Sequence, residues 1–185
     1  FEAAGGAIFS EDWIKFDTEE PDEGEYYISV DLAGFADIEK ATTSKQKKLD
    51  TTSISVVKAG PDGWWVDNVI YGRWDVKKTA DKIFQAVRDY QPIAVGVEKG
   101  ALKNAVHPYL LDRMKQEQFF FRVEELTHGN KRKTDRIIWA LQGRFEHGQI
   151  TLNEGDWNIV FLDHLFQFPN HLGVYFLVDS FAYIY

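Results

Sequence analysis

The stretch Tyr-Tyr-Ile-Ser-Val-Asp-Leu at residues 26–32 decides the fold expected for this chain. Aromatic and β-branched residues dominate it, which is typical of a β-strand, and an aspartate stands near its end. A carboxylate among buried aliphatic side chains is costly unless a positive charge compensates it. Glu98 closes another apolar run, and Asp179 interrupts a third. We interpret Asp31, Glu98 and Asp179 as ligands of one bound divalent cation site.

Length and composition favour a single domain with a sizeable core. The chain has 185 residues, of which 44% are hydrophobic and 15% aromatic. It contains no cysteine, so any metal must be bound through oxygen or imidazole. No apolar run approaches the ~20 residues of a membrane-spanning helix, so we expect a soluble protein with no membrane contact. The net charge of −8 disfavours nonspecific attraction to nucleic acid, so any contact with a polyanion must be regional.

The first third of the chain predicts three neighbouring strands. Strand composition recurs at residues 51–58, where Ile54 and Val56 alternate with serines, and at 64–74, which follows a Pro-Asp-Gly turn signal. The lysine-rich segment 36–50 has no apolar periodicity and is expected to be a solvated loop. Together the three strands predict an antiparallel meander.

The rest of the chain predicts alternating helices and strands. Helices are expected at 75–90, with Asp75 as its cap, and at 101–116, 134–145, 157–168 and 172–185; strands are expected at 93–97 and 119–123, with a short edge strand at 148–152. Strand-helix-strand alternation implies parallel pairing. We therefore predict an α/β fold with a mixed sheet, three antiparallel strands followed by parallel ones, and helices on both faces. That topology is shared by the ribonuclease H-like nucleases.

In such a layout the first strand is central and a parallel strand lies beside it, which would bring the three acids together. Oxygen ligands of this kind suit Mg²⁺ or Mn²⁺, and two such ions can clamp the attacking and leaving oxygens of a phosphodiester. Each acid also has a structural alternative. Asp31 can begin a turn before Gly34, Glu98 can cap a helix after Gly100, and Asp179 can be a solvated charge.

The sequence resembles the C-terminal nuclease domain of the large terminase subunit of tailed bacteriophages. The matching elements are Gly-Ala-Ile-Phe-Ser-Glu-Asp-Trp-Ile (6–14), the stretch around Asp31 (26–34), Ala-Val-Gly-Val-Glu-Lys-Gly (94–100), Asn-Lys-Arg-Lys-Thr-Asp-Arg-Ile (130–137) with Phe-Glu-His-Gly-Gln-Ile (145–150), and Leu-Val-Asp-Ser-Phe-Ala-Tyr-Ile (177–184). The resemblance implies a ribonuclease H-like endonuclease that cuts concatemeric double-stranded viral DNA during packaging with two Mg²⁺ or Mn²⁺ ions. It assigns the metal and the catalysis to Asp31, Glu98 and Asp179.

The resemblance also implies the surroundings of the domain. Residues 1–24 are expected to lead in from an upstream ATPase domain, and residues 25–185 to form the nuclease domain. The chain has no phosphate-binding Gly-x-x-x-x-Gly-Lys motif of its own. The implied partners are double-stranded DNA, the portal and the small terminase subunit, in the host cytoplasm. Many relatives carry an acidic pair or a histidine where this chain has Tyr175 and Phe176, which implies that Asp179 alone supplies the third carboxylate or that the nuclease is altered.

Basic segments are candidates for contact with DNA phosphates, although a solvated face is the alternative for each. The candidates are Lys131, Arg132, Lys133 and Arg136 before and within a predicted helix, and Lys45, Lys47 and Lys48 in the early loop. Asp50 and His128 are secondary candidates: Asp50 for an acid near the metal site, with turn capping as its alternative, and His128 for orienting a water molecule. The tryptophans, including Trp64, Trp65, Trp74, Trp139 and Trp157, are expected in the core.

Two other functions compete with the packaging nuclease. Another ribonuclease H-like enzyme, such as a junction resolvase or a transposase core, would share the acids but lack the lead-in and the basic helix. A non-catalytic docking domain would keep the fold and use its acidic surface to meet the portal or the small subunit. Tyr175 and Phe176 are the feature that favours the docking function.

Overall fold

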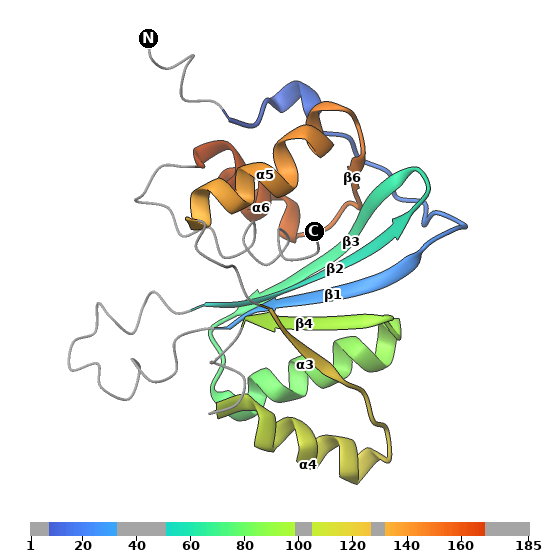
Figure 1. The fold of residues 1–185 in the computed structure, drawn as a ribbon, viewed down its shortest axis with the longest axis vertical. Helices are drawn as coiled ribbons and strands as arrows, with labels where there is room; N and C mark the ends of the chain where they lie inside the picture. Colours follow the sequence, from blue (N-terminus) through green and yellow to red (C-terminus); the bar gives the residue numbers. More distant parts are fainter. Residues whose placement is uncertain (1–7, 33–50, 99–104, 127–131, 169–185) are drawn as a thin grey trace, which may run out of the picture.

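The structure, a computed structural model, describes residues 8–32, 51–98, 105–126 and 132–168. A six-stranded mixed sheet with strand order β5-β4-β1-β2-β3-β6 lies at its centre (Figure 1). The strands are β1 (Glu25–Asp31), β2 (Thr52–Gly60), β3 (Gly63–Gly72), β4 (Ala94–Glu98), β5 (Val123–Leu126) and β6 (Ile150–Leu152). The helices are the short 3₁₀ helix η1 (Glu11–Trp13) and the α-helices α3 (Val76–Tyr90), α4 (His107–Glu117), α5 (Lys133–Glu146) and α6 (Trp157–Gln167).

The sheet topology predicted from the sequence is confirmed. β1, β2 and β3 form an antiparallel meander, β4 pairs parallel to β1, and β5 pairs parallel to β4. The predicted edge strand is β6, which pairs parallel to β3. Strands β1, β3, β4, β5 and β6 therefore all end, and β2 begins, at one end of the sheet. We call it the carboxyl end, and the opposite one the amino end.

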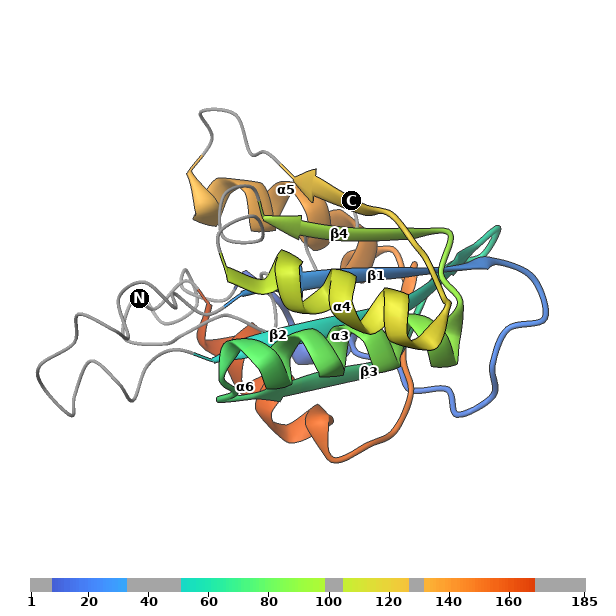
Figure 2. The same cartoon turned by 90° about the horizontal axis from the view of Figure 1, so that it is seen from below.

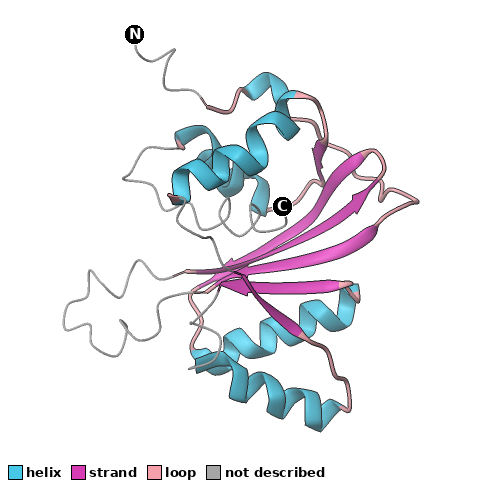
Figure 3. Cartoon of the chain, viewed as in Figure 1, coloured by secondary structure: helices cyan, strands magenta, loops and turns pink. Residues whose placement is uncertain are grey.

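Helices cover both faces of the sheet, as predicted. α3 and α4 lie on one face, and α5 and α6 lie on the other (Figures 1, 2 and 3). The first face packs Ile28, Val30 and Val97 of the sheet against Ile83 and Phe84 of α3. The second packs residues of β3 and β6 against α5 and α6 in a separate apolar cluster. Among the described residues, no helix has the length and apolar character needed to cross a bilayer.

Local signals explain both ends of α3. The carboxylate of Asp75 accepts a hydrogen bond from the backbone N–H of Lys78 at 2.7 Å, which confirms the predicted cap. At the other end Gln91 adopts a left-handed conformation with φ of 47°, and Pro92 follows. Arg113 of α4 then joins the two helices, because its guanidinium pairs with Asp81 at 3.1 Å.

The strand predicted at 119–123 is present, but its bounds differ, because β5 begins at Val123 and ends at Leu126. Phe119 and Phe121 instead turn their rings toward Phe84, at centroid distances of 5.8 and 6.2 Å. These aromatic residues fill the α3 and α4 core from a loop. The actual strand β5 is polar, with the sequence Val-Glu-Glu-Leu, as suits a sheet edge.

The helix predicted at 101–116 corresponds to α4, which begins at His107; Pro108 fits its first turn because the missing N–H is not needed there. Residues 101–104 lie outside the described residues. The core position expected for one tryptophan is wrong. Trp139 is not a core residue, since it is 70% exposed on the outer side of α5, whereas Trp64, Trp65 and Trp157 are buried. The core side of α5 is filled by Ile137, Ala140, Leu141 and Phe145 instead. The loop predicted at 36–50 and the helix predicted at 172–185 lie outside the described residues.

Residues 8–17 pack into the same body as the sheet. Phe9 is 3% exposed and contacts the rings of Phe145 and Phe168. Farther along, Phe16 forms a parallel bridge with Leu152, and the backbone oxygen of Asp17 accepts a hydrogen bond from the Trp65 indole at 2.8 Å. A domain boundary between residues 24 and 25 stays a prediction.

Replacing Phe9 with alanine is expected to lower the free energy of unfolding by about 3 kcal/mol, because a buried ring is removed from the α5 and α6 core. Phe16 is the matched control: it is 47% exposed, so its replacement should cost about 1 kcal/mol or less. Urea unfolding followed by tryptophan fluorescence measures both. Equal losses in the two variants would show that Phe9 does not belong to the folding unit.

Candidate functional site

Two of the three predicted acids end neighbouring parallel strands at the same level. Val30 of β1 lies opposite Val97 of β4, and each strand ends one residue later, at Asp31 and at Glu98. Neighbouring strands lie about 4.8 Å apart, so the backbones of the two acids are adjacent. The structure therefore brings Asp31 and Glu98 to one point of the carboxyl end by strand register alone.

Asp31 is buried on the face of the sheet that carries α5 and α6. Its side chain must point there because side chains alternate along a strand, and its neighbour Val30 belongs to the α3 and α4 core. The residue is 9% exposed, and its pairing partner on β2 is Ser53, which is 0% exposed. The next pair on this face is Ser29 and Ser55, also buried. Asp31 thus ends a buried polar row in the centre of the sheet.

Sequence reasoning did not identify these serines as part of the site. The alternation of Ser53 and Ser55 with Ile54 and Val56 separates the two faces of β2 correctly, but all four residues are buried. The sequence shows that the serines share one face of β2, but only the structure shows that this face is buried beside Asp31.

The third predicted ligand, Asp179, and the secondary candidates Asp50 and His128 lie outside the described residues. So do Tyr175 and Phe176, the two positions at which this chain differs from many relatives. For Glu98 the structure describes the backbone and not the side chain. Among the side chains that are described, no group of three or more acids or histidines is arranged to hold a metal ion. A carboxylate triad stays a prediction.

The predicted DNA contacts belong to segments that border the carboxyl end. The segment with Lys45, Lys47 and Lys48 joins the end of β1 to the start of β2, and the segment with Lys131 joins the end of β5 to α5. These four lysines lie outside the described residues. Arg132 is exposed immediately before α5. Lys133 and Arg136 lie in the first turn of α5, where the structure describes their backbone and not their side chains.

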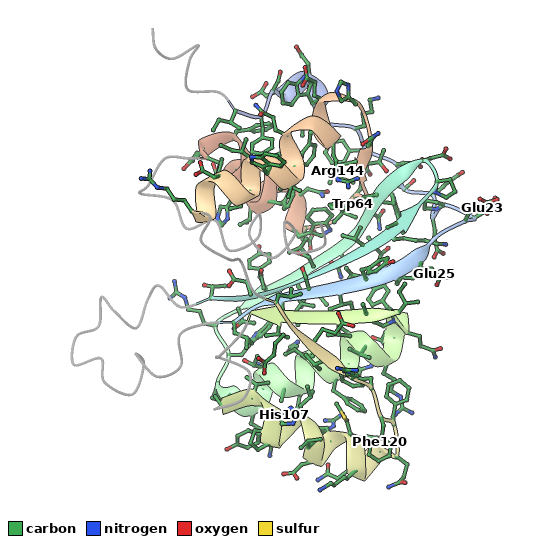
Figure 4. All side chains as sticks on the ribbon, in the orientation of Figure 1. Glu23, Glu25, Trp64, His107, Phe120 and Arg144 are labelled. Atoms are coloured by element: carbon green, nitrogen blue, oxygen red, sulfur yellow. The ribbon has the colours of Figure 1, made fainter. Side chains whose placement is uncertain are left out.

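The amino end of the sheet is acidic, in contrast to the basic segments that border the carboxyl end. Residues 11–25 contain eight carboxylates and one lysine, whereas residues 26–185 contain acidic and basic side chains in equal number. Glu23 and Glu25 mark this end in Figure 4, away from the strand ends that carry Asp31 and Glu98. The net negative charge of the chain is therefore concentrated far from the candidate metal ligands.

Some of this acidic segment is held by specific contacts. The Glu20 carboxylate accepts a hydrogen bond from the Tyr26 hydroxyl at 2.6 Å and pairs with Lys58 at 3.2 Å. The hydrogen bonds from Tyr26 and from Lys58 hold the pKa of Glu20 below its ordinary value. Nearby, the guanidinium of Arg144 lies 4.2 Å from the centre of the Trp64 ring (Figure 4). A cleft of about 600 Å³ opens beside Glu20, Lys58 and Trp64; six of its lining residues are acidic and one is basic, so it does not suit a polyanion.

No protein-family model and no curated protein sequence matches this chain. Solved structures match it closely in shape. The large terminase nuclease from the thermophilic phage G20c superposes with a TM-score of 0.62 at 14% identity, covering 96% of each chain. The same nuclease with bound magnesium gives a TM-score of 0.63 at 13% identity, covering 96% of this chain and 95% of that one.

The fold is that of a large terminase nuclease domain. The human cytomegalovirus terminase nuclease domain, soaked with manganese and bound to an inhibitor, superposes with a TM-score of 0.58 at 14% identity and covers 92% of this chain and 88% of its own. The large terminase from a second thermophilic bacteriophage superposes with a TM-score of 0.52 at 12% identity over 79% of this chain, but only 32% of that protein is covered. The ribonuclease H-like fold class expected from the sequence is confirmed.

Mn²⁺ is expected to raise the melting temperature of the protein, because an ion that binds only the folded state stabilises it by mass action. Asp31→Asn should abolish most of this shift, since the variant loses a charged oxygen ligand at the carboxyl end. Asp112→Asn, an exposed carboxylate on α4, is the control and should keep the full shift. Thermal unfolding with Mn²⁺ and with EDTA measures the effect; an undiminished shift in Asp31→Asn would exclude this carboxylate as a ligand.

Proposed function

We propose that this chain is a divalent-metal-dependent endonuclease that cleaves concatemeric double-stranded viral DNA during genome packaging. The observation that carries the proposal is the strand register, which places Asp31 and Glu98 side by side at the carboxyl end of a sheet with the terminase nuclease fold. Ligands and substrates of open α/β sheets bind at the carboxyl ends of the strands, which agrees with this position.

The residues at this point fit Mg²⁺ or Mn²⁺. Carboxylate oxygens are the ligands that these ions prefer, and the chain has no thiolate to offer instead. Magnesium is bound in the G20c nuclease structure, and the cytomegalovirus domain was soaked with manganese. In this proposal Asp31, Glu98 and Asp179 hold two ions. When bound, such ions supply the positive charge that stabilises the attacking and leaving oxygens of a phosphodiester.

The contribution of the protein itself is to hold these ligands in place. β1 pairs with β2 on one side and β4 on the other, so the backbone of Asp31 is held from both sides at a strand end. Burial of Asp31 keeps its carboxylate out of bulk water, where it would otherwise be fully hydrated. A rigid strand end is a better support for a metal ligand than a loop is.

The packaging context is part of the proposal. The large terminase of the second thermophilic phage extends well beyond the region that resembles this chain, and one of its structures is in complex with ADP. By analogy, we place an ATPase domain upstream in the same polypeptide, with the portal and the small terminase subunit as partners in the host cytoplasm. Tethering to such a motor would compensate for the weak DNA affinity of an acidic domain.

Cleavage assays distinguish the alternatives. Wild-type protein is expected to cut plasmid DNA with Mn²⁺ or Mg²⁺ and to be inactive in EDTA. Asp31→Asn and Glu98→Gln should each reduce the rate more than about 100-fold, because loss of groups that only orient metal ligands already costs up to about that much. Asp112→Asn is the control. Cleavage restricted to four-way junctions would support a resolvase, and no cleavage with any metal would support a docking domain.

The third acid has a test of its own. Asp179→Asn is expected to reduce Mn²⁺-dependent cleavage as severely as Asp31→Asn while leaving the urea unfolding midpoint within the range of the Asp112→Asn control. If Asp179→Asn cleaves at the wild-type rate, the C-terminal segment does not supply the third ligand, and the assignment must move to another acid.

A further inference from the structure

The turn between β3 and α3 lies at the carboxyl end, level with the candidate metal ligands. Asp31 pairs with Ser53 of β2, and Ser53 pairs with Tyr71 of β3, so the three residues form one row across the sheet. Two strand spacings of about 4.8 Å separate the outer members of this row. Arg73 follows Tyr71 by two residues, which puts its backbone on the order of 10 Å from that of Asp31.

Several contacts hold this turn. The indole of Trp74 covers Gly72 so closely that a Cβ at that position would clash with the indole nitrogen. Asp75 caps α3 through the Lys78 N–H, and the Thr79 hydroxyl donates a hydrogen bond to the Asp75 backbone oxygen at 2.8 Å. Thr79 is itself fully buried. The backbone that carries Arg73, Lys77 and Lys78 is therefore fixed by contacts on both sides.

Arg73, Lys77 and Lys78 form an exposed cationic group, which we call the α3 cationic cluster. None of the three forms an ion pair with another described residue. Of the two acids next to the cluster in the sequence, Asp75 caps the helix through the Lys78 N–H, and Asp81 pairs with Arg113 at 3.1 Å. The cluster therefore exposes three cations that have no ion-pair partner among the described residues.

The position of the lysines is unfavourable for the helix itself. The first turn of an α-helix carries partial positive charge, so acidic residues stabilise it and cations destabilise it. The first turn of α3 contains no acidic residue and two lysines, Lys77 and Lys78. Helix stability therefore does not explain the lysines, whereas exposed lysine and arginine side chains are the groups that commonly contact DNA phosphates.

We propose that the α3 cationic cluster binds backbone phosphates of double-stranded DNA beside the cleavage site. The proposal rests on the nuclease function proposed above and adds residues that position its substrate. Phosphates along one strand of a duplex are spaced about 3.4 Å apart along the helix axis, so the backbone separation between Arg73 and Asp31, on the order of 10 Å, corresponds to roughly three base pairs. Such contacts would hold the duplex across the carboxyl end of the sheet, with the β3–α3 turn to one side of the bond that is cleaved.

The test compares two double variants with the same change of charge. Lys77→Gln with Lys78→Gln removes two cations of the cluster, and Lys115→Gln with Arg122→Gln removes two exposed cations from the amino end of the sheet. Binding to a labelled duplex is measured in EDTA over a series of salt concentrations. The slope of log K against log salt should become smaller by up to about 2 in the cluster variant, since each phosphate contact contributes about 0.9. The control variant should keep the wild-type slope.

Thermal unfolding of the same proteins separates a binding role from a structural one. The cluster variant should melt at the wild-type temperature or above it, because two cations leave the positive end of a helix. A lower melting temperature, or a salt slope equal to that of the control, would overturn the inference while wild-type cleavage leaves the nuclease function standing. If the wild-type protein neither binds nor cuts DNA, the nuclease function fails and this inference fails with it.

Discussion

The parallel pairing of β1 with β4 is the constraint on which the rest of the structure depends. It joins strands far apart in the sequence and sets Asp31 and Glu98 at one level. The pairing is held by apolar residues on the α3 face, where Ile28, Val30 and Val97 are almost completely buried against α3. A shift of one residue would turn these side chains to the other face, so the same contacts that stabilise the sheet also fix the register of the acids.

Charge is divided between the two ends of the sheet. The acidic residues at 11–25 gather near the start of β1, and the cations of the β3–α3 turn stand where β1 ends. Because residues 26–185 carry balanced charge, a polyanion is not attracted to the chain as a whole, and it meets a repulsive amino end and a locally cationic carboxyl end. In the proposed function, this distribution of charge would direct DNA to the candidate metal ligands without a high overall affinity.

The sequence predicted most of the fold because its strands and helices have strong local patterns. Asp75 as a cap and the alternation at Ile54 and Val56 were sufficient to place α3 and β2. The failures occur where packing overrides pattern. Phe119 and Phe121 look like strand residues but serve as loop anchors for Phe84, and Trp139 has the composition of a core residue but lies outside the apolar face of α5. Residue type alone does not show which rings pack together or which side of a helix faces the core.

For the site, the sequence identified Asp31 and Glu98 as candidates, but it did not show that they lie next to each other. An aspartate after an apolar strand is common, and only the register shows that Asp31 and Glu98 are neighbours. The direction of Asp31 then restricts the third ligand. α3 and α4 occupy one face of the sheet, so a side chain that reaches Asp31 from outside the sheet must come from the face of α5 and α6. The chain leaves α6 at Phe168, within the apolar cluster of that face, and the segment that follows carries Asp179. Asp179, in the segment after α6, stays the predicted third ligand.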